Sequence, residues 1–176
     1  MREILENGVY VIYENGSYKP YSGKNQKKSG VKIGIAQDGH YFAIPLDYNY
    51  GNKQLLQEYK ERDVHCVSEC DALLNWDFKK ETEHLKTLGL VPQLKEGHYL
   101  PTAPVFLAIY ANREKINNAL KHFGVQPIDF DDYYWFAQRY SAYYAWYFSG
   151  TNKYLYGGSV GYTIQCLAVS LCEPKF

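Results

Sequence analysis

The stretch DDYYWFAQRYSAYYAWYFSGTNKYLYGGSVGYTI, residues 131–164, decides how this chain is interpreted. Nine of the chain's nineteen tyrosines fall within it, and only Asp131, Asp132, Arg139 and Lys153 carry charge. Tyrosine offers a large, stiff and amphipathic contact area at low entropic cost, and Ser, Gly and Asn between the tyrosines supply adaptable hydrogen bonds. The composition is therefore typical of a recognition surface. A tyrosine-rich β-core of the same composition is the alternative.

Length and charge limit the class of protein. A chain of 176 residues fits one domain, or one domain with an extension. The net charge is zero and no basic block is concentrated in one segment, which argues against binding to nucleic acid. No apolar stretch approaches the roughly 20 residues of a membrane span, so membrane insertion is not expected. The polar N-terminus lacks the apolar region of a signal peptide, which favours a cytoplasmic or virion-associated protein over a secreted one.

The first part of the chain is predicted to be β-rich. Aromatic and β-branched runs predict strands over residues 8–13, 30–36 and 40–46. Asn15-Gly16 is a strong hairpin signal after the first run, and residues 37–39 predict a second hairpin. Pro45 is expected at an edge or a strand end, because proline cannot donate to a ladder.

The middle of the chain is predicted to be helical, and the end returns to strands. Apolar spacing predicts helices over residues 53–62, 79–88 and 104–122. We expect Thr102 to cap the last helix, which is predicted to break near Ala111. The later strands are predicted over residues 133–136, 145–148 and 162–169. The order indicates an α+β fold, in which residues 1–50 form a β-rich extension packed on a main domain of residues 51–176.

Motifs for catalysis are absent, so no enzyme, cofactor or catalytic residue is predicted. His65, Cys66 and Cys70 give only a weak indication of a metal site, and reduced structural thiols are favoured. A disulfide between Cys166 and Cys172 stays open. A solvated acidic turn at residues 129–132 is favoured over a site for a hard cation, and the glycines of residues 156–161 are interpreted as a loop.

Several segments resemble one family pattern. They are residues 75–82 (NWDFKKET), 99–103 (YLPTA), 109–113 (IYANR), 116–120 (INNAL), 134–135 (YW), 140–142 (YSA) and 145–148 (AWYF). Together they resemble the Lcl C-terminal-like and fibrobacter-type paralogous domains, which have the C-type-lectin-like fold. That pattern runs from a Leu-Pro helix start to an Ile-Asn-x-Ala-Leu helix end, then through a Tyr-Trp strand and an Ala-Trp strand to a closing strand. The run GVYVIYENGSY is similar to the β-hairpin that often precedes this domain in gut-bacterial and phage proteins.

Departures from the pattern fall at its polar positions. Phe136-Ala137-Gln138 stands where the family has Ser-Ser-Thr, and Ile164-Gln165 where it has Val-Arg. Phe78 replaces a glycine, and Val105-Phe106 replaces Glu-Leu. The scaffold positions fit the family, namely Leu100, Pro101, Trp135 and Trp146. The resemblance therefore implies the fold more strongly than any site.

The tyrosine bias is similar to that of one group with this fold, the variable proteins of diversity-generating retroelements. There, adenines of an RNA template are randomised, so that an AAC codon for Asn becomes Tyr, Ser, Asp, Gly, Phe or Ala, among others. The resemblance implies diversified positions at Tyr143, Tyr144, Tyr147, Ser149, Tyr154 and Tyr156. Adenine changes in AAC cannot produce the residues at four positions, which are interpreted as constant: Trp135, Gln138, Trp146 and Lys153.

The favoured function is a ligand-binding module, an adhesin or receptor-binding protein that contacts a protein or glycan on a target cell surface. The predicted ligand-binding residues are Phe136, Arg139, Tyr140, Tyr143, Tyr144, Tyr147, Ser149, Tyr154 and Tyr156. We expect most of these side chains to be exposed and to form one contiguous face. A structural phage or pilus subunit is the alternative, in which the tyrosines form a contact between copies in an oligomer. An enzyme of unrecognised type is a third, weaker interpretation.

Overall fold

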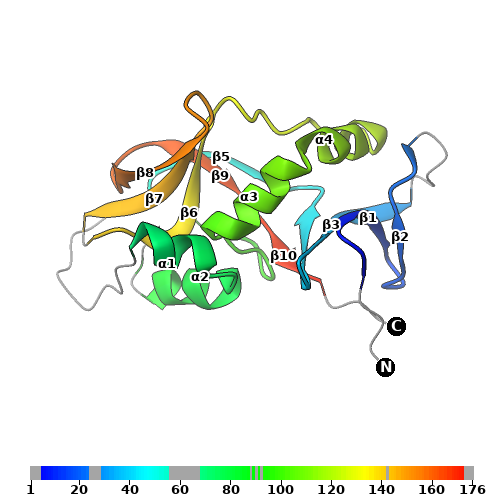
Figure 1. The fold of residues 1–176 in the computed structure, drawn as a ribbon, viewed down its shortest axis with the longest axis horizontal. Helices are drawn as coiled ribbons and strands as arrows, with labels where there is room; N and C mark the ends of the chain where they lie inside the picture. Colours follow the sequence, from blue (N-terminus) through cyan, green and yellow to red (C-terminus); the bar gives the residue numbers. More distant parts are fainter. Residues whose placement is uncertain are drawn as a thin grey trace. The chain divides into compact units, whose positions relative to one another are not determined.

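Two mostly antiparallel five-stranded sheets and four helices make up the described part of this α+β protein (Figure 1). The computed structural model describes residues 5–23, 29–55, 68–87, 89, 91, 93–141 and 143–172. The chain forms two compact units. Unit 1 contains the described parts of Met1–Tyr48, Ala108–Asp129 and Val169–Phe176, and unit 2 those of Asn49–Leu107 and Phe130–Ala168.

Unit 1 is built on a sheet with the strand order β10-β4-β3-β1-β2. Its strands are β1 (Gly8–Tyr13), β2 (Tyr18–Pro20), β3 (Gly30–Gln37), β4 (His40–Pro45) and β10 (Ser170–Leu171). Both predicted hairpins are confirmed, because Asn15-Gly16 joins β1 to β2 and Asp38-Gly39 joins β3 to β4. Gly16 and Gly39 have φ angles of 78° and 80°, which glycine adopts without strain. Pro45 lies at the end of β4, as predicted.

Helix α4 (Arg113–His122) belongs to the same unit and buries its apolar stripe of Ile116, Ala119 and Leu120. The chain leaves this helix through a loop that is held back onto it. Asn117 accepts a hydrogen bond from the Ile128 backbone N–H and donates one to the Ile128 carbonyl, both at 2.9 Å. The loop therefore has a fixed path before the chain enters unit 2.

Unit 2 contains the tyrosine-rich stretch. Its sheet has the order β5-β9-β6-β7-β8, and only the β6–β9 pair is parallel. The strands are β5 (Asn49–Lys53), β6 (Tyr133–Arg139), β7 (Tyr144–Ser149), β8 (Tyr154–Ser159) and β9 (Ile164–Leu167). The helices are α1 (Glu69–Leu74), α2 (Phe78–Thr87) and the part of α3 (Ala103–Ala111) that precedes residue 108.

Two groups of apolar side chains lie in the core of unit 2. One surrounds the fully buried Trp135 and includes Leu55, Leu100, Val160 and Ile164. The other is aromatic and surrounds Phe106 of α3, whose ring centroid lies 5.0–6.3 Å from four rings: Phe130, Tyr134, Phe136 and Phe148. Because successive strand residues point to opposite faces, Trp135 and Phe136 anchor β6 into both groups.

The helix predictions hold for the two later helices. The predicted helix over 79–88 is confirmed as α2, and the predicted break near Ala111 is confirmed, since α3 ends there and α4 begins at Arg113. Within the predicted helix over 53–62, Lys53 ends strand β5 instead, and residues 56–62 lie outside the described residues. Strands β5, β8 and β10 and helix α1 were not predicted.

Thr102 lies at the N-cap position of α3, as predicted, but its side chain does not form the capping hydrogen bond. Its carbonyl accepts the first helical hydrogen bond, from Phe106 at 2.9 Å, so the position is that of an N-cap. Its hydroxyl, however, is buried and has no hydrogen-bond partner among the described residues. The Ala103 N–H is satisfied instead by the side-chain oxygen of Gln138, at 2.8 Å.

Candidate ligand-binding site

Strands β6, β7 and β8 and the turn after β8 bring five tyrosines together, which we call the tyrosine cluster: Tyr133, Tyr147, Tyr154, Tyr156 and Tyr162. Tyr147 on β7 is central. Its ring centroid lies 6.0 Å from that of Tyr133 on β6 and 5.9 Å from that of Tyr156 on β8, with which it stacks at 28°. Tyr154 makes an edge contact with Tyr156 at 5.6 Å. The cluster therefore runs across three neighbouring strands.

The cluster lies at the surface except at its centre. Tyr133 is 40% exposed, Tyr154 52%, Tyr156 39% and Tyr162 57%, whereas Tyr147 is half-buried. Burial, with the nearby hydroxyls of Tyr133, Tyr156 and Tyr162, raises the pKa of Tyr147 above the usual tyrosine value. Contiguous exposed rings of this kind are uncommon on a protein surface that contacts only water.

A hydrophobic anchor lies beside the cluster, on the same face of the sheet. Trp135 pairs with Tyr147 across the strands, and the two rings meet edge to face at 5.9 Å. Trp135 is fully buried, and its indole N–H donates to the Lys53 carbonyl at 3.0 Å. The only polar atom of the indole is thus satisfied, and the buried ring fixes one side of Tyr147.

Loops and a helix fix the rim of the cluster. The Tyr154 hydroxyl donates to the Glu69 carboxylate of α1 at 2.8 Å, which raises the pKa of Tyr154. The Tyr156 hydroxyl accepts from the Asn152 amide at 3.4 Å. These hydrogen bonds fix the orientation of the two hydroxyls.

The expectation of one contiguous face is wrong, because the tyrosines divide between the two faces of β8. A side chain at Gly158 would point at Tyr147, with its Cβ 2.6 Å from the ring, whereas one at Gly157 would point at Tyr140, at 2.9 Å. Consecutive strand residues face opposite sides, so Tyr140 lies on the face opposite the cluster. There it contacts Trp146 at 5.0 Å between ring centroids.

The two glycines also correct the interpretation of residues 156–161 as a loop. Residues 154–159 form strand β8, with a regular register against all six residues of β7. The rings of Tyr140 and Tyr147 occupy the space that side chains at Gly157 and Gly158 would take. The glycine pair is therefore a consequence of packing in a strand.

The other predicted ligand-binding residues fall into two sets. Tyr140, Tyr143 and Tyr144 are exposed, at 51%, 40% and 43%. Phe136, Arg139 and Ser149 are buried, and their prediction as exposed contact residues is wrong. For Phe136 and Arg139 the reason is that β6 is covered on both faces, so polarity and alternation do not reveal which of its side chains reach solvent.

Each buried residue of that set has an identifiable structural contact. Phe136 packs on Phe106 at 5.6 Å between centroids. The Arg139 guanidinium donates to the Ser141 carbonyl at 3.1 and 3.2 Å. The Ser149 hydroxyl accepts from the Asn152 N–H at 3.3 Å, in the turn between β7 and β8. These contacts shape the strands and turns that carry the exposed tyrosines.

Acidic residues 129–132 fit the interpretation as a turn before a strand. Asp131 forms an ion pair with Lys153 at 2.5 Å, and Asp132 accepts from the Gln165 amide at 3.0 Å. Within the described ranges, no three His, Cys, Asp or Glu side chains gather closely enough to hold a metal ion. His65 and Cys66 lie outside those ranges.

The described cysteines carry free thiols, so the disulfide between Cys166 and Cys172 is not formed. Burial raises the pKa of Cys166 to about 12 and also raises that of Cys172. A thiol is reactive as the thiolate, and burial in apolar surroundings disfavours that form. Neither residue has the environment of a nucleophile.

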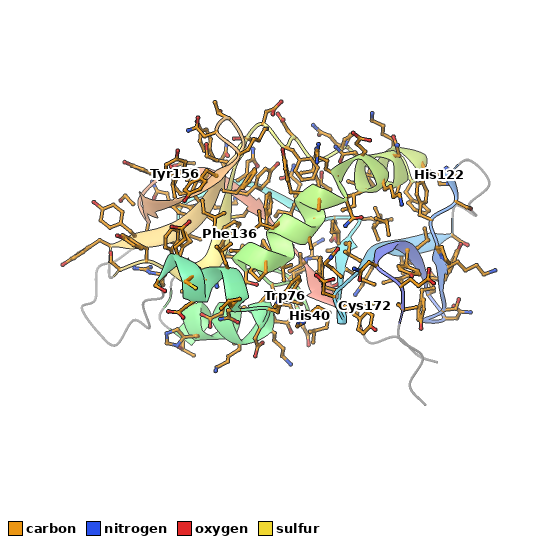
Figure 2. The ribbon with its side chains drawn as sticks, in the orientation of Figure 1. His40, Trp76, His122, Phe136, Tyr156 and Cys172 are labelled. Carbon is orange, nitrogen blue, oxygen red and sulfur yellow. The ribbon has the colours of Figure 1, made fainter. Side chains whose placement is uncertain are left out.

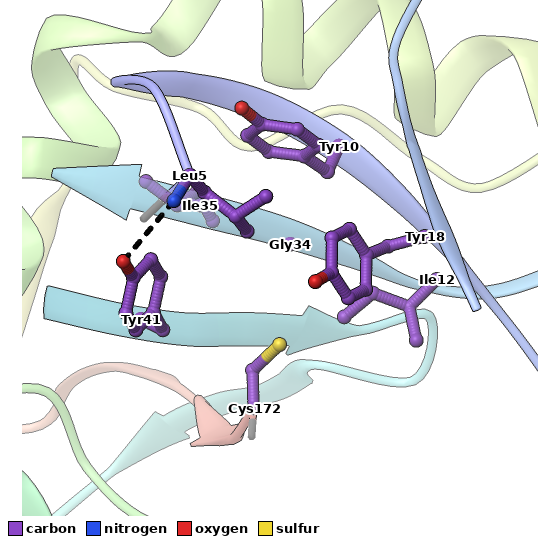
Figure 3. Close-up of a pocket in the computed structure, with 8 residues that line it drawn as sticks. All are labelled: Leu5, Tyr10, Ile12, Tyr18, Gly34, Ile35, Tyr41 and Cys172. Carbon is purple, nitrogen blue, oxygen red and sulfur yellow. Dashed lines mark hydrogen bonds between the residues drawn. The ribbon is translucent and has the colours of Figure 1, made fainter. Parts of the chain in front are cut away.

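Two hollows lie away from the cluster. In unit 1, a cavity of about 10 Å³ is lined by apolar and aromatic side chains including Tyr10, Ile12 and Cys172, which Figure 3 shows around Gly34. This volume holds about one water molecule, so it is too small for an organic ligand. In unit 2, a shallow polar depression of about 680 Å³ lies along β5, lined mainly by amide side chains: Asn49, Asn52, Gln54 and Gln93. The amide-rich run at residues 49–54 was the available sequence signal for it, but sequence analysis did not single it out.

Figure 2 labels Tyr156 of the cluster on β8 and the buried Phe136 on β6, two strands of the same sheet that are separated by β7. No family model, no curated protein and no solved structure matches this chain. None of the helices in the described part of the chain combines the length and the apolar character needed to cross a bilayer.

Proposed function

We propose that residues 51–176 form a C-type-lectin-like binding module, and that its tyrosine cluster binds a protein or glycan on the surface of a target cell. The observation that carries the proposal is the ring-to-ring array of exposed tyrosines around Tyr147, supported by the buried Trp135. Tyrosine is enriched among the residues that dominate binding energy, and a rigid support lowers the entropy lost on binding.

The placement of the motif residues supports the lectin-like fold. Leu100-Pro101 lies one residue before α3, and the run at residues 116–120 lies within α4. Trp135 lies in β6, Trp146 in β7 and Ile164-Gln165 in β9. These are the helix start, helix end, two strands and closing strand that the family pattern implies. The N-terminal hairpin of β1 and β2 also agrees with it.

The division between constant and diversified positions supports diversification by a retroelement. The Gln138 amide bonds to the backbones of Ala72 and Ala103 at 2.9 and 2.8 Å, and both Trp135 and Trp146 are buried. Lys153 adopts a φ of 56° and bonds to the Phe130 carbonyl at 3.2 Å. No change of the adenines in an AAC codon gives a codon for Trp, Gln or Lys, so these four residues are interpreted as constant. Each of them is buried or makes a structural hydrogen bond.

Most positions proposed as diversified lie where replacement leaves the frame intact. Tyr143, Tyr144, Tyr154 and Tyr156 are exposed, and Tyr147 is half-buried. Ser149 is the exception, because it is buried in the turn after β7. Selection for varied contacts with a constant fold would produce this distribution.

The binding test compares a triple variant within the tyrosine cluster with a triple variant outside it. The first replaces Tyr133, Tyr156 and Tyr162 by serine, and the second replaces Tyr140, Tyr143 and Tyr144. Both sets contain three exposed tyrosines of similar exposure, between 39% and 57%. Binding of the purified protein to a glycan array and to intact bacterial cells is measured by fluorescence.

We expect the first triple variant to lose at least about tenfold in affinity and the second to lose less than about threefold. Equal binding by the wild type and the first variant would contradict the proposed site. A larger loss in the second variant would place the site at Tyr140, Tyr143 and Tyr144 instead.

Diversification has its own test in the surrounding DNA. We expect a reverse transcriptase gene nearby and an imperfect repeat of the segment that encodes residues 131–164, with mismatches confined to template adenines. If the genome lacks these elements, diversification by a retroelement is contradicted, whereas the proposed binding function is unaffected.

A further inference from the structure

The outer edge of β8 differs from the other three sheet edges. An exposed edge presents unpaired N–H and C=O groups, and proteins protect such edges with short strands, lysine, proline or bulges. Strand β2 has three residues and contains Lys19 and Pro20, and β10 has two residues. Strand β5 carries a register shift and ends in Lys53. Each of these three edges therefore has a protecting feature.

Strand β8 has none of these features. Its six residues, YLYGGS, include no charged residue and no proline, and they pair with β7 without a register shift. Its place at the end of the sheet order leaves its outer side unpaired by any described strand. A regular, uncharged edge of this length is suited to the addition of another strand.

The direction of the free backbone groups follows from two hydrogen bonds. Val160 N–H donates to the Tyr143 carbonyl at 3.1 Å, and Gly150 N–H donates to the Asp132 carbonyl at 2.8 Å. Hydrogen-bonding direction alternates along an antiparallel strand. Val160 bonds toward β7, so the alternate residues before it, Gly158, Tyr156 and Tyr154, also direct their N–H and C=O groups toward β7. Gly150 bonds toward β6, so the alternate residues of β7 before it also face β6 and the others face β8, which agrees with this direction. The N–H and C=O groups of Leu155 and Gly157 point outward.

We propose that two copies of this chain pair through their β8 edges, antiparallel about a two-fold axis at Tyr156. Leu155 of one copy then exchanges two hydrogen bonds with Gly157 of the other, and the converse pair forms on the far side of the axis. Residues at the axis form a non-hydrogen-bonded pair, in which side chains approach most closely. This places the two Tyr156 rings side by side.

The properties of β8 favour a second copy as the occupant of this edge. The strand is uncharged, so two copies meet without charge repulsion. Aromatic pairs opposite one another across antiparallel strands are stabilising. Each Tyr156 ring is already stacked on Tyr147 at an interplanar angle of 28°. Pairing therefore places the two Tyr156 rings between the two Tyr147 rings in one row. The dimer thus joins the two tyrosine clusters into one continuous surface.

The pairing goes beyond the proposed ligand binding and does not depend on it. A six-residue strand with a few tyrosines forms a small interface, so we expect a weak, reversible dimer. Light scattering over a concentration series should show the mass rising from 20.4 kDa toward twice that value. A mass that stays at one chain up to the solubility limit overturns the proposal.

A matched pair of variants separates edge pairing from contact through the tyrosine face. Tyr156 on β8 and Tyr133 on β6 are 39% and 40% exposed, and both contact Tyr147. We expect Tyr156→Lys to weaken dimerisation at least tenfold, because the two lysines would meet at the axis. Tyr133→Lys, on an interior strand, should dimerise as the wild type does. Equal loss in both variants overturns the edge pairing and favours a face-to-face contact.

Hydrogen exchange on the wild type gives a readout that requires no variant. The amides of Leu155 and Gly157 should exchange more slowly at high protein concentration than at low concentration, while that of Tyr156, which already points toward β7, should change little. If the Leu155 and Gly157 amides exchange at the same rate at all concentrations, the strands do not pair. Because none of these measurements involves a ligand, failure of the dimer leaves the proposed function untouched.

Discussion

Gln138 and Ala103 are joined by a hydrogen bond across 35 residues of chain, in which the Gln138 Oε1 accepts from the Ala103 N–H at 2.8 Å. The Nε2 of the same side chain donates to the Ala72 carbonyl at 2.9 Å. One buried amide on β6 therefore satisfies the first residue of α3 and the last turn of α1. The tyrosine-bearing strand and both helices share this connection.

We expect Gln138→Leu to lower the free energy of unfolding by roughly 2–4 kcal/mol, because it leaves two buried backbone groups without partners. Urea titration followed by tryptophan fluorescence measures the change. Gln93→Leu is the matched control, since Gln93 is exposed, and its effect should stay within about 0.5 kcal/mol. A similar effect of the two substitutions would show that the Gln138 amide does not support the fold.

Alanine at the two glycines of β8 should have unequal effects. The Gly158 position faces the ring of Tyr147, which is enclosed by Tyr133, Trp135 and Tyr156 and cannot move aside. Overpacking of this kind costs about 1–3 kcal/mol. Tyr140, which faces Gly157, is 51% exposed and can rotate outward.

We therefore expect Gly158→Ala to lower the melting temperature by several degrees more than Gly157→Ala does, by calorimetry. The reverse order would mean that Tyr140 is the more constrained ring.

Thiol labelling should distinguish the described cysteines in the native protein. Cys70 is exposed, whereas burial raises the pKa of Cys166 to about 12. At pH 8, a maleimide reagent should modify Cys70 within minutes and leave Cys166 intact, and both should react in urea. Peptide mass spectrometry identifies the sites. Rapid native labelling of Cys166 would show that the core around Trp135 opens readily.

Tyr48 gives unit 1 a contribution to stability that is lost at alkaline pH. Its hydroxyl donates to the Gln126 carbonyl at 2.8 Å, and burial raises its pKa to about 12. Because the folded pKa lies above the unfolded value of about 10, the folded state retains the proton in that interval. The contribution is therefore complete below about pH 10 and is lost as the pH rises from 10 to 12.

We expect Tyr48→Phe to cost about 1 kcal/mol at pH 8, through the lost hydrogen bond, and to make the free energy of unfolding less sensitive to pH above 10. Urea titrations at pH 8, 10 and 11 on both proteins provide the test. Parallel pH profiles would assign the alkaline loss to other groups.

Local signals predicted a large part of the fold. Asn15-Gly16 and Asp38-Gly39 fixed two hairpins through turn chemistry, and the apolar spacing of α2 and α4 matched the helical period. Strand β8 was missed because Gly157-Gly158 has the local composition of a loop. The reason for these glycines is the approach of Tyr140 and Tyr147, which no short-range pattern contains.

The predicted site illustrates the same limit. Exposure of Tyr140, Tyr144 and Tyr156 follows from their places near strand ends and on an edge strand. The burial of Phe136 and Arg139 depends on both faces of β6 being covered, which is a property of the tertiary structure. Composition identified a segment that carries exposed tyrosines, but it could not divide the residues of that segment between core and surface.

The separation of buried anchors from exposed rings on neighbouring strand positions has a practical use. Tyr133, Tyr156 and Tyr162 extend from a sheet whose interior is completed by Trp135, Gln138 and Trp146. Codons at the three tyrosines can be randomised together while the interior is kept constant. The protein is therefore a natural starting scaffold for combinatorial libraries of engineered affinity reagents.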